Sequence, residues 1–246
     1  MFKIPLFLSN LKTKKIAQKV AYMQSINSTN TAIYKMLLND EVKIKDVLIA
    51  EQQTDGKGRR GDKWLSSKNK SLTFSFIINS EELSINKLSL LIGISIIKGI
   101  QKTANIRCKL KWPNDIMHEN KKLGGVLIEK KRTHYIIGIG LNVNDRIFDS
   151  SIKSRACSIY SITNNEISRE LLLAEIFNSY EQIVNKDIAQ IIKIWESFCN
   201  HMNTFVKFHH SKKIVNAKFS GLNKHGNAIM SINNNQEIFN SGIIEL

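Results

Sequence analysis

The sequence predicts an α+β fold in which a mixed β-sheet is flanked by helices and followed by a small β module. Strand-like runs separated by glycines and turn residues occupy much of residues 47–143, on either side of one helical period at 87–103, and helical periods return at 168–184 and 188–202. With 246 residues, of which 42% are hydrophobic, the chain is long enough to bury a sizeable core. We expect one larger domain over residues 1–202 and a smaller one over residues 203–246.

The first third of the chain alternates helix and strand patterns. Apolar residues at helical spacing follow Ser28-Thr29-Asn30, three residue types that favour a helix N-cap, so a helix of roughly ten residues begins there. The run VLIAEQ (47–52) is typical of a strand. In SLTFSFII (71–78) apolar residues alternate with polar ones, which also predicts a strand.

The middle of the chain predicts one buried helix and three strands. From Lys87 to Thr103 the period is helical and nearly all positions are apolar, so this helix should be buried. Strand patterns follow in RCKLKW (107–112), GVLIEKK (125–131) and HYIIGIGLNV (134–143).

The end of the chain changes character. Four short strand-like runs (FVKF, IVNAKFSGL, AIMSI and EIFNSGIIEL) are separated by turn residues such as those of Asn223–Gly226. We therefore expect a β-barrel-like module of about forty residues here.

The chain is strongly basic, with a formal net charge of +15. Such a charge is compatible with binding to nucleic acid or to a membrane surface. The lysines are nevertheless scattered through the whole chain among abundant Asn and Ile, which favours a bias of composition over a dedicated binding face.

Cysteine usage and hydropathy favour a soluble cytoplasmic protein. Cys108, Cys157 and Cys199 are isolated, so neither a disulfide framework nor a zinc site is indicated. The longest apolar run, 88–97, has about half the length that a membrane-spanning helix needs. At the N-terminus the cations follow the apolar patch, which is the wrong order for a secretory signal.

The segment DGKGRRGDKW (55–64) combines backbone freedom with positive charge. Its glycines allow amide N–H groups to converge on an anion, and its cations can neutralise a polyphosphate. No Lys-Ser/Thr follows the last glycine, so it is not a P-loop, and its glycine spacing does not match a dinucleotide-binding motif. Taken alone, the segment could also be a flexible basic hairpin tip.

Three further motifs lie at predicted strand ends. They are K-W-P-N-D (111–115), K-L-G-G (122–125) and G-I-G-L-N-V-N (138–144). Strand ends are where a pocket built on a sheet would gather such residues, and glycines there let a ligand approach the backbone closely.

In this order, the motifs closely resemble the biotin–protein ligases, also called biotin–[acetyl-CoA-carboxylase] ligases. The matching segments are S-T-N (28–30), Q-x-x-G-K-G-R-R-G-x-x-W (53–64), K-W-P-N-D (111–115), K-L-G-G-V-L-I-E (122–129) and G-I-G-L-N-V-N (138–144). The resemblance implies a catalytic domain like those of class II aminoacyl-tRNA synthetases and biotin ligases, with an SH3-like β-barrel at the C-terminal end. Only about twenty-five residues precede S-T-N, too few for the DNA-binding domain of many relatives. We therefore expect the monofunctional type, without operator binding.

The resemblance also implies a two-step reaction. Biotin and ATP first form biotinyl-5′-AMP and pyrophosphate, with Mg²⁺ as the expected metal ion. A lysine of the biotin carboxyl carrier protein of acetyl-CoA carboxylase, or of a related carboxylase, then takes the biotinyl group and releases AMP. The glycine-rich segment would fold over the adenylate and protect it from water.

The resemblance assigns roles to the matching residues. Lys111, Arg59 and Arg60 are expected to act in catalysis, where charge develops on the α-phosphate. The residues expected to bind biotin are Ser28, Thr29, Asn30, Gln53, Gly56, Lys57, Gly58, Arg59, Lys111, Gly124 and Gly125. Those expected to bind the nucleotide are Arg59, Arg60, Trp64, Lys111, Asn114 and Asn142.

Several of these residues have a structural alternative. The S-T-N segment could simply cap a helix, Trp64 could be a core aromatic residue, and Asn142 could cap a strand end. Asn114 and Asp115 either shape the turn or help to hold Mg²⁺, and no cluster of metal ligands is expected. Lys57 stands where the family most often has arginine, which keeps the charge but loses the planar fork.

Two other functions remain as alternatives. A lipoate or octanoyl transferase would share the fold, although the paired G-K-G-R-R-G and K-W-P-N-D motifs speak against it. A non-catalytic nucleic-acid-binding protein should interleave aromatic residues with its cations, and only Trp64 and Trp112 lie near the cationic motifs. A homodimer is possible, but the sequence does not identify an unpaired sheet edge.

Overall fold

A seven-stranded mixed sheet forms the centre of the structure, a computed structural model that describes residues 1–211, 213–233 and 235–246. β1 and β2 are parallel, and every other neighbouring pair is antiparallel. In spatial order the strands are β1 (Val20–Met23), β2 (Val47–Ala50), β5 (Leu72–Asn79), β9 (His134–Leu141), β8 (Lys121–Lys131), β7 (Asp115–His118) and β6 (Lys109–Lys111). The predicted mixed sheet is confirmed.

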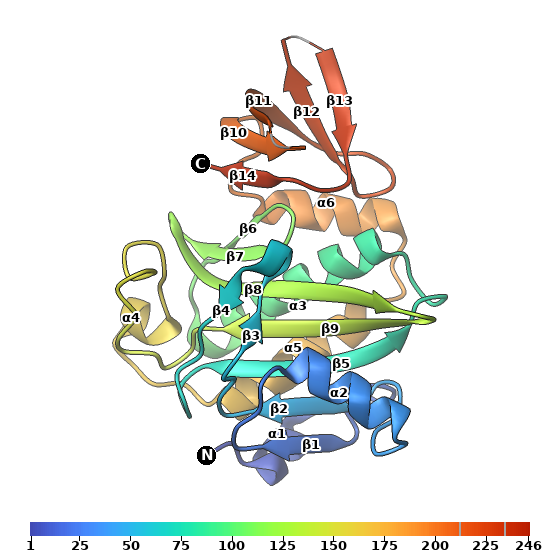
Figure 1. Ribbon diagram of the computed structural model, residues 1–246, viewed down its shortest axis with the longest axis vertical. Helices are drawn as coiled ribbons and strands as arrows, with labels where there is room; N and C mark the ends of the chain where they lie inside the picture. Colours follow the sequence, from blue (N-terminus) through green and yellow to red (C-terminus); the bar gives the residue numbers. More distant parts are fainter. Residues whose placement is uncertain (212, 234) are drawn as a thin grey trace.

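Helices cover both faces of this sheet (Figure 1). On one face α3 (Ile85–Ala104) and α5 (Arg169–Ile183) pack against each other, with α1 (Ile4–Asn10) and α6 (Ile188–Phe198) beside them. On the other face α2 (Thr29–Leu38) packs over β2 and β5. The predicted helices are confirmed, while the short helices α1 and α4 (Ile159–Thr163) had no clear signal in the sequence.

The central strand β5 is buried on both sides because it lies between these two helix layers. Phe74 and Phe76 face α5, where their rings lie 5.7 and 5.4 Å from that of Phe177. Thr73 and Ser75 alternate with them and point toward the α2 side, yet they are only 1% and 0% exposed. The polar residues of this strand therefore face a covered region of the molecule and not solvent.

The C-terminal sheet is antiparallel and has the strand order β13-β12-β11-β10-β14. Its strands are β10 (Phe205–His210), β11 (Lys213–Leu222), β12 (Ala228–Ile232), β13 (Asn235–Phe239) and β14 (Ile243–Glu245). Within the described residues the sheet does not close into a barrel, because β13 and β14 lie at its two edges and do not pair with each other. The chain passes close to the Phe208 ring at Gly242 before β14 pairs with β10. The predicted β module is confirmed in an open form, and the domain boundary at 202/203 stays a prediction.

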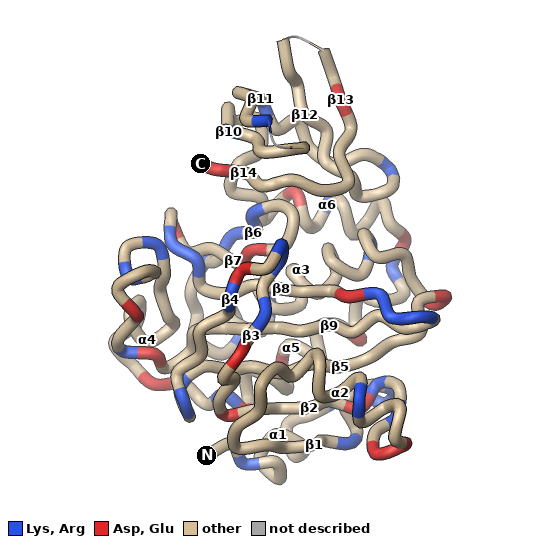
Figure 2. Tube along the Cα trace, in the orientation of Figure 1, with Lys and Arg blue, Asp and Glu red and all other residues tan. Residues whose placement is uncertain are grey.

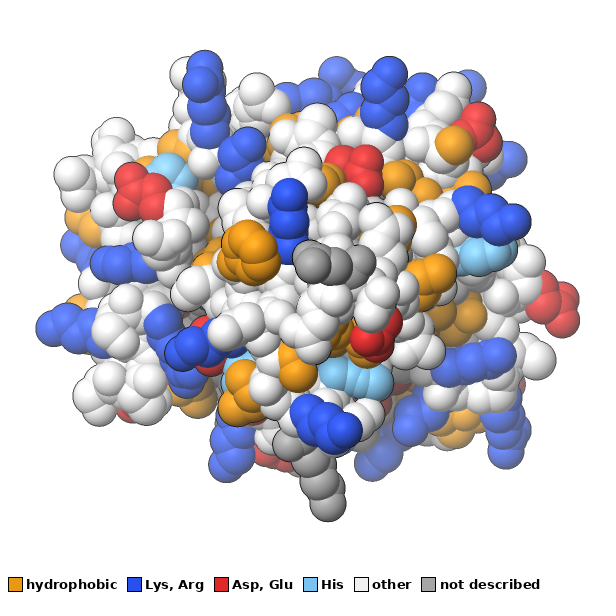
Figure 3. Space-filling view, turned by 90° about the horizontal axis from the view of Figure 1, so that it is seen from above, with side chains coloured by type: hydrophobic (Ala, Val, Ile, Leu, Met, Phe, Trp, Pro, Cys, Tyr) orange, Lys and Arg blue, Asp and Glu red, His pale blue; other side chains and the backbone are white. Residues whose placement is uncertain are grey.

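The cations are spread through the fold (Figure 2). Viewed from above the C-terminal sheet, lysine and arginine side chains are dispersed over the visible face and form no single patch (Figure 3). Cys108, Cys157 and Cys199 are free and buried. No helix in the described ranges is long and apolar enough to cross a membrane.

The junction between the two sheets contains a buried histidine. Helix α6 ends at Phe198, earlier than the predicted residue 202, because Cys199 becomes extended and pairs with Leu110 of β6. His201 follows with 0% exposure, and its ring lies 4.3 Å from that of Phe219. Burial, with a smaller effect from the charge of Lys111, lowers the pKa of His201 to about 3.

We expect His201 to make the protein acid-sensitive. Its pKa is depressed in the fold, so the stability that neutral His201 contributes is complete above the unfolded pKa of about 6.5 and is lost as the pH falls toward 3. Between pH 7 and pH 5 the wild type should lose about 2 kcal/mol more free energy of unfolding than His201→Gln. Urea denaturation at both pH values measures this difference. The exposed His225→Gln serves as the control, and equal losses in all three proteins would contradict the prediction.

Candidate active site

The glycine-rich segment forms a small hairpin across the α2 side of the sheet (Figure 1). Its strands are β3 (Gly56–Lys57) and β4 (Lys63–Trp64), joined by the 3-10 turn η1 (Arg59–Gly61). Gly61 has a φ of +86°, a left-handed conformation that favours glycine. The backbone N–H of Gly58 donates to the carbonyl of Asp62 at 2.7 Å, so the segment has a defined hairpin structure.

The hairpin borders a cavity of about 630 Å³ that also contains residues from the other motifs. The Arg59 segment and Lys111 therefore share one cavity, as the sequence predicts. Thirteen of the fifteen predicted site residues line it: Ser28, Thr29, Asn30, Gln53, Lys57, Gly58, Arg59, Arg60, Trp64, Lys111, Asn114, Gly125 and Asn142. Their individual roles stay predictions.

Gly56 and Gly124 are the two predicted residues that do not line this cavity. A Cβ at Gly56 would lie 3.2 Å from the Trp64 Cβ and closer still to the Trp64 carbonyl. A Cβ at Gly124 would lie 2.8 Å from the carbonyl oxygen of Gly140 and would also overlap the Leu141 side chain. At both positions a larger residue would clash with the neighbouring strand, so glycine is required here for packing between strands.

One end of the cavity is lined by neutral polar groups around the start of α2. Ser28 is the N-cap residue of this helix, but its side chain makes no capping bond. The carbonyl oxygen of the Gln53 side chain accepts from the Thr29 backbone N–H at 2.7 Å and lies 3.0 Å from the Thr29 hydroxyl. Gln53 thus accepts the hydrogen bond that an N-cap side chain would otherwise accept from the start of α2. The amide NH₂ of Gln53 and the hydroxyl of Ser28 are therefore not needed for helix capping.

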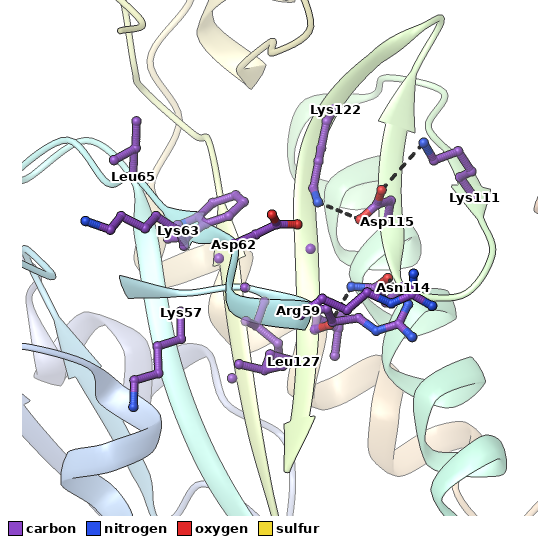
Figure 4. Close-up of a pocket in the computed structure, with 18 of the residues that line it drawn as sticks. Lys57, Arg59, Asp62, Lys63, Leu65, Lys111, Asn114, Asp115, Lys122 and Leu127 are labelled. Atoms are coloured by element: carbon purple, nitrogen blue, oxygen red, sulfur yellow. Dashed lines mark hydrogen bonds and ion pairs between the residues drawn. The ribbon is translucent and has the colours of Figure 1, made fainter. Parts of the chain in front are cut away.

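The other end holds several cations around Asp115, and the Asp62 carboxylate also lines the cavity there (Figure 4). Asp115 lies with Oδ1 2.6 Å from Lys122 Nζ and with Oδ2 3.7 Å from Lys111 Nζ. Arg59 crosses from the hairpin and donates to Asn114 Oδ1 at 3.2 Å, while Asn114 Nδ2 donates to the Val126 carbonyl. Burial, and then the neighbouring charge of Arg60, lowers the pKa of Arg59.

The cations of the hairpin do not all converge on one point. Lys57 and Lys63 point away from Asp115, and Lys57 Nζ lies 3.2 Å from the Thr31 hydroxyl of α2 (Figure 4). Arg60 is exposed, with a left-handed φ of 56°. The hairpin therefore brings Arg59 to the Lys111 end, with the charge of Arg60 near it, whereas Lys57 and Lys63 point elsewhere.

The Trp64 indole packs against the sheet at Gly140. A Cβ at Gly140 would fall within 2.6 Å of Trp64 Nε1, so only glycine leaves room for the indole. The indole N–H is buried and has no hydrogen-bond partner among the described residues. Asn142 also lines the cavity, but its Nδ2 donates to the Cys157 carbonyl at 3.0 Å, which matches the strand-end role named as its alternative.

We expect Gly140→Ala to displace the Trp64 indole from the sheet. If Trp64 stacks on the nucleotide, the KM for ATP should rise by about five- to 150-fold, because stacking on an aromatic residue contributes about 1–3 kcal/mol. Steady-state kinetics with varied ATP measures this effect. Gly93→Ala, which adds a methyl group in α3 beside Leu110, is the control for a general loss of packing. An unchanged KM for ATP would contradict the stacking role.

The sequence did not single out several residues of the cavity wall. Lys122 belongs to the K-L-G-G motif, so the sequence contained a signal, but only the two glycines were assigned a role. Gly138 and Gly140 likewise stand in a predicted motif. Ile243 and Ile244 of β14 also line the cavity, and nothing in their local sequence indicates that the C-terminal sheet reaches this site.

Residues 22–144 match the sequence model of the Biotin/lipoate A/B protein ligase family. The chain belongs to this family. This matched range supplies most of the residues that line the cavity, including those of S-T-N, the glycine-rich hairpin, K-W-P-N-D and K-L-G-G.

Proteins similar to this chain include named biotin ligases. The bifunctional ligase/repressor BirA of Bacillus subtilis is 27% identical over 250 residues, which cover 96% of this chain and 76% of the relative. The biotin–[acetyl-CoA-carboxylase] ligase of Mycobacterium tuberculosis is 32% identical over 103 residues, or 39% of each chain. The structure of the Aquifex aeolicus biotin protein ligase in complex with biotin and ATP superposes with a TM-score of 0.83 at 30% identity, covering 93% of this chain and 98% of that one.

Proposed function

We propose that the chain is a biotin–protein ligase, which activates biotin with ATP and transfers it to a lysine of a carrier domain. The observation that carries this function is the shared cavity, in which the Arg59–Asn114 contact and Lys111 lie at one end and the polar residues around Gln53 at the other. A cavity that is neutral and polar at one end and cationic at the other suits a substrate with a ureido ring and a carboxylate tail. The similar Aquifex aeolicus ligase was solved with biotin and ATP.

The first step must bring two anions together, the biotin carboxylate and the α-phosphate of ATP. Lys111 and Arg59 would lower this repulsion because fixed cations act strongly in a site that excludes water. Both cations are held by neighbours, Lys111 near Asp115 and Arg59 by Asn114, so little reorganisation is needed when charge moves to the phosphate oxygens. The hairpin would then cover the adenylate until the acceptor lysine attacks its carbonyl carbon and AMP leaves.

Biotin and ATP are the substrates, and we assign the expected Mg²⁺ to the ATP that enters. The described residues contain no group of three or more His, Cys, Asp or Glu that could hold a metal ion. Asp115, the carboxylate next to Lys111, is already paired with Lys122. Mg²⁺ commonly binds through substrate phosphates together with one or two carboxylates, so the ATP phosphates are its main expected ligands.

The acceptor would be the biotin carboxyl carrier domain of a biotin-dependent carboxylase, as for biotin–protein ligases in general. The net charge of +15 would favour encounter with an acidic carrier. The cytoplasmic location and the possible homodimer stay predictions.

Lipoate or octanoate as the transferred acid is not favoured. The matched family includes lipoate ligases, but the similar relatives and solved structures named above are biotin ligases. A lipoyl chain also has no ureido ring to use the amide and hydroxyl groups of Gln53, Thr29 and Ser28.

Biotin-dependent exchange of labelled pyrophosphate into ATP tests the first step, and mass spectrometry of a carrier domain tests the second. We expect exchange that biotin supports and lipoate neither supports nor inhibits, followed by a mass gain of one biotinyl group on the carrier. A folded protein that shows no exchange with biotin would refute the proposed function. Exchange supported by lipoate alone would favour the alternative.

A further inference from the structure

A buried serine lies directly behind the polar end of the cavity. Ser75, in the middle of β5, is 0% exposed, and its Oγ lies 2.7 Å from both Thr29 Oγ1 and Asn30 Oδ1. Thr29 and Asn30 line the cavity, whereas Ser75 does not. The serine therefore contacts two wall residues from behind.

The Asn30 amide is held from its other side by a carboxylate. Asn30 Nδ2 donates to Glu129 Oε2 at 2.7 Å. A carboxylate only accepts hydrogen bonds, so Glu129 requires the NH₂ of Asn30 to face it and the amide oxygen to face Ser75. The Ser75 hydroxyl donates toward both Asn30 Oδ1 and Thr29 Oγ1, and the Thr29 hydroxyl donates in turn to Gln53 Oε1.

The backbone of β9 packs tightly against the Asn30 amide. Gly138 of β9 lies opposite Ser75 in the strand register. A Cβ at Gly138 would lie 2.9 Å from Asn30 Cγ and would overlap the amide oxygen. The Asn30 amide is therefore seated against the sheet and held by hydrogen bonds at both ends, while Thr29 is held between Ser75 and Gln53.

We propose that Ser75 and Glu129 are positioning residues for the ring end of biotin. They fix the orientation of the Thr29 hydroxyl and of the Asn30 amide without touching the substrate. Donors and acceptors held in place before binding cost less to order when the ligand arrives, so this network raises affinity for biotin and leaves the nucleotide end unaffected. The inference rests on the proposed function, because it names biotin as the ligand.

The test compares Ser75→Ala, Glu129→Gln and wild type in biotin-dependent pyrophosphate exchange. Ser75→Ala removes one hydroxyl, and loss of its hydrogen bonds should raise the KM for biotin about tenfold while the KM for ATP changes less than about twofold. Glu129→Gln keeps the shape but no longer dictates which way the Asn30 amide faces, so it should raise the KM for biotin about threefold.

Ser95→Ala is the matched control. Ser95 is also 0% exposed, but its hydroxyl donates to the Leu91 carbonyl within α3, outside the cavity wall. The inference is wrong if Ser75→Ala raises both KM values equally, leaves both unchanged, or is matched by Ser95→Ala. If Ser75→Ala does not fold, Glu129→Gln decides, and an unchanged KM for biotin overturns the inference. A wild type without exchange refutes the proposed function itself and this inference with it, whereas an active wild type with unaffected variants refutes the inference alone.

Discussion

Replacing Lys111 by methionine should lower the rate of adenylate formation by about a thousandfold, because removing one fixed group that stabilises transition-state charge costs roughly 3–4 kcal/mol. Lys111 is the last residue of β6, where pairing with Asp115 of β7 fixes its backbone. Its side chain is 20% exposed and lies at the cationic end of the cavity. Methionine keeps much of the length and apolar stem, so the charge is the main difference. Single-turnover formation of the adenylate measures the effect.

Lys109→Met is the control for this substitution. Lys109 lies two residues earlier on the same strand, is exposed, and does not line the cavity. Its replacement should change the rate less than about twofold. Equal losses in the two variants, or a Lys111→Met enzyme within about tenfold of wild type, would mean that Lys111 does not act on the reacting groups.

Arg59→Ala should reduce adenylate formation about a hundredfold and increase the release of adenylate into solution. The Arg59 side chain is partly buried and donates a hydrogen bond to Asn114 Oδ1. This bond connects the hairpin to the turn that follows Trp112. Losing this charge-assisted bond removes both a cation near the phosphate and a contact that holds the hairpin over the cavity. Filter binding of labelled adenylate gives the release rate, and quenched-flow kinetics gives the rate of formation.

Lys63→Ala is the matched control within the same hairpin. Lys63 also borders the cavity, but its side chain is exposed and points away from the Asp115 cluster (Figure 4). We expect it to retain most of the activity. The role of Arg59 would be disproved by a Lys63→Ala enzyme that loses as much activity as Arg59→Ala, because the hairpin would then act through its overall charge alone.

Local patterns were sufficient to predict most of the fold. Alternation and β-branched content located β2, β5 and β9, and the helical period located α3. Short elements were missed: β7 begins at Asp115 inside a motif that was interpreted as a turn, and it has only four residues. The sequence cannot show whether the C-terminal strands close into a barrel, because closure depends on whether the two edge strands, β13 and β14, pair with each other.

The sequence predicted the cavity because the residues of its motifs lie close together in the fold. The predicted residues that do not line the cavity, Gly56 and Gly124, are placed by how neighbouring strands pair. Gly124 stands in the same motif as Gly125, but successive residues of a strand face opposite sides, and only Gly125 lines the cavity. The packing of Trp64 on Gly140 joins residues that are far apart in the chain. The part played by Ser75 could not be inferred from its strand pattern, because burial of the α2 side of β5 depends on where the helix packs.

The central claim is that this cavity joins biotin to AMP before any acceptor is present. The most direct measurement is to incubate the protein with biotin and MgATP, remove free ligands, denature the protein and analyse the released small molecules by mass spectrometry. We predict about one biotinyl-5′-AMP per chain from the wild type and almost none from Lys111→Met. A folded wild type that releases only biotin and ATP would contradict the account.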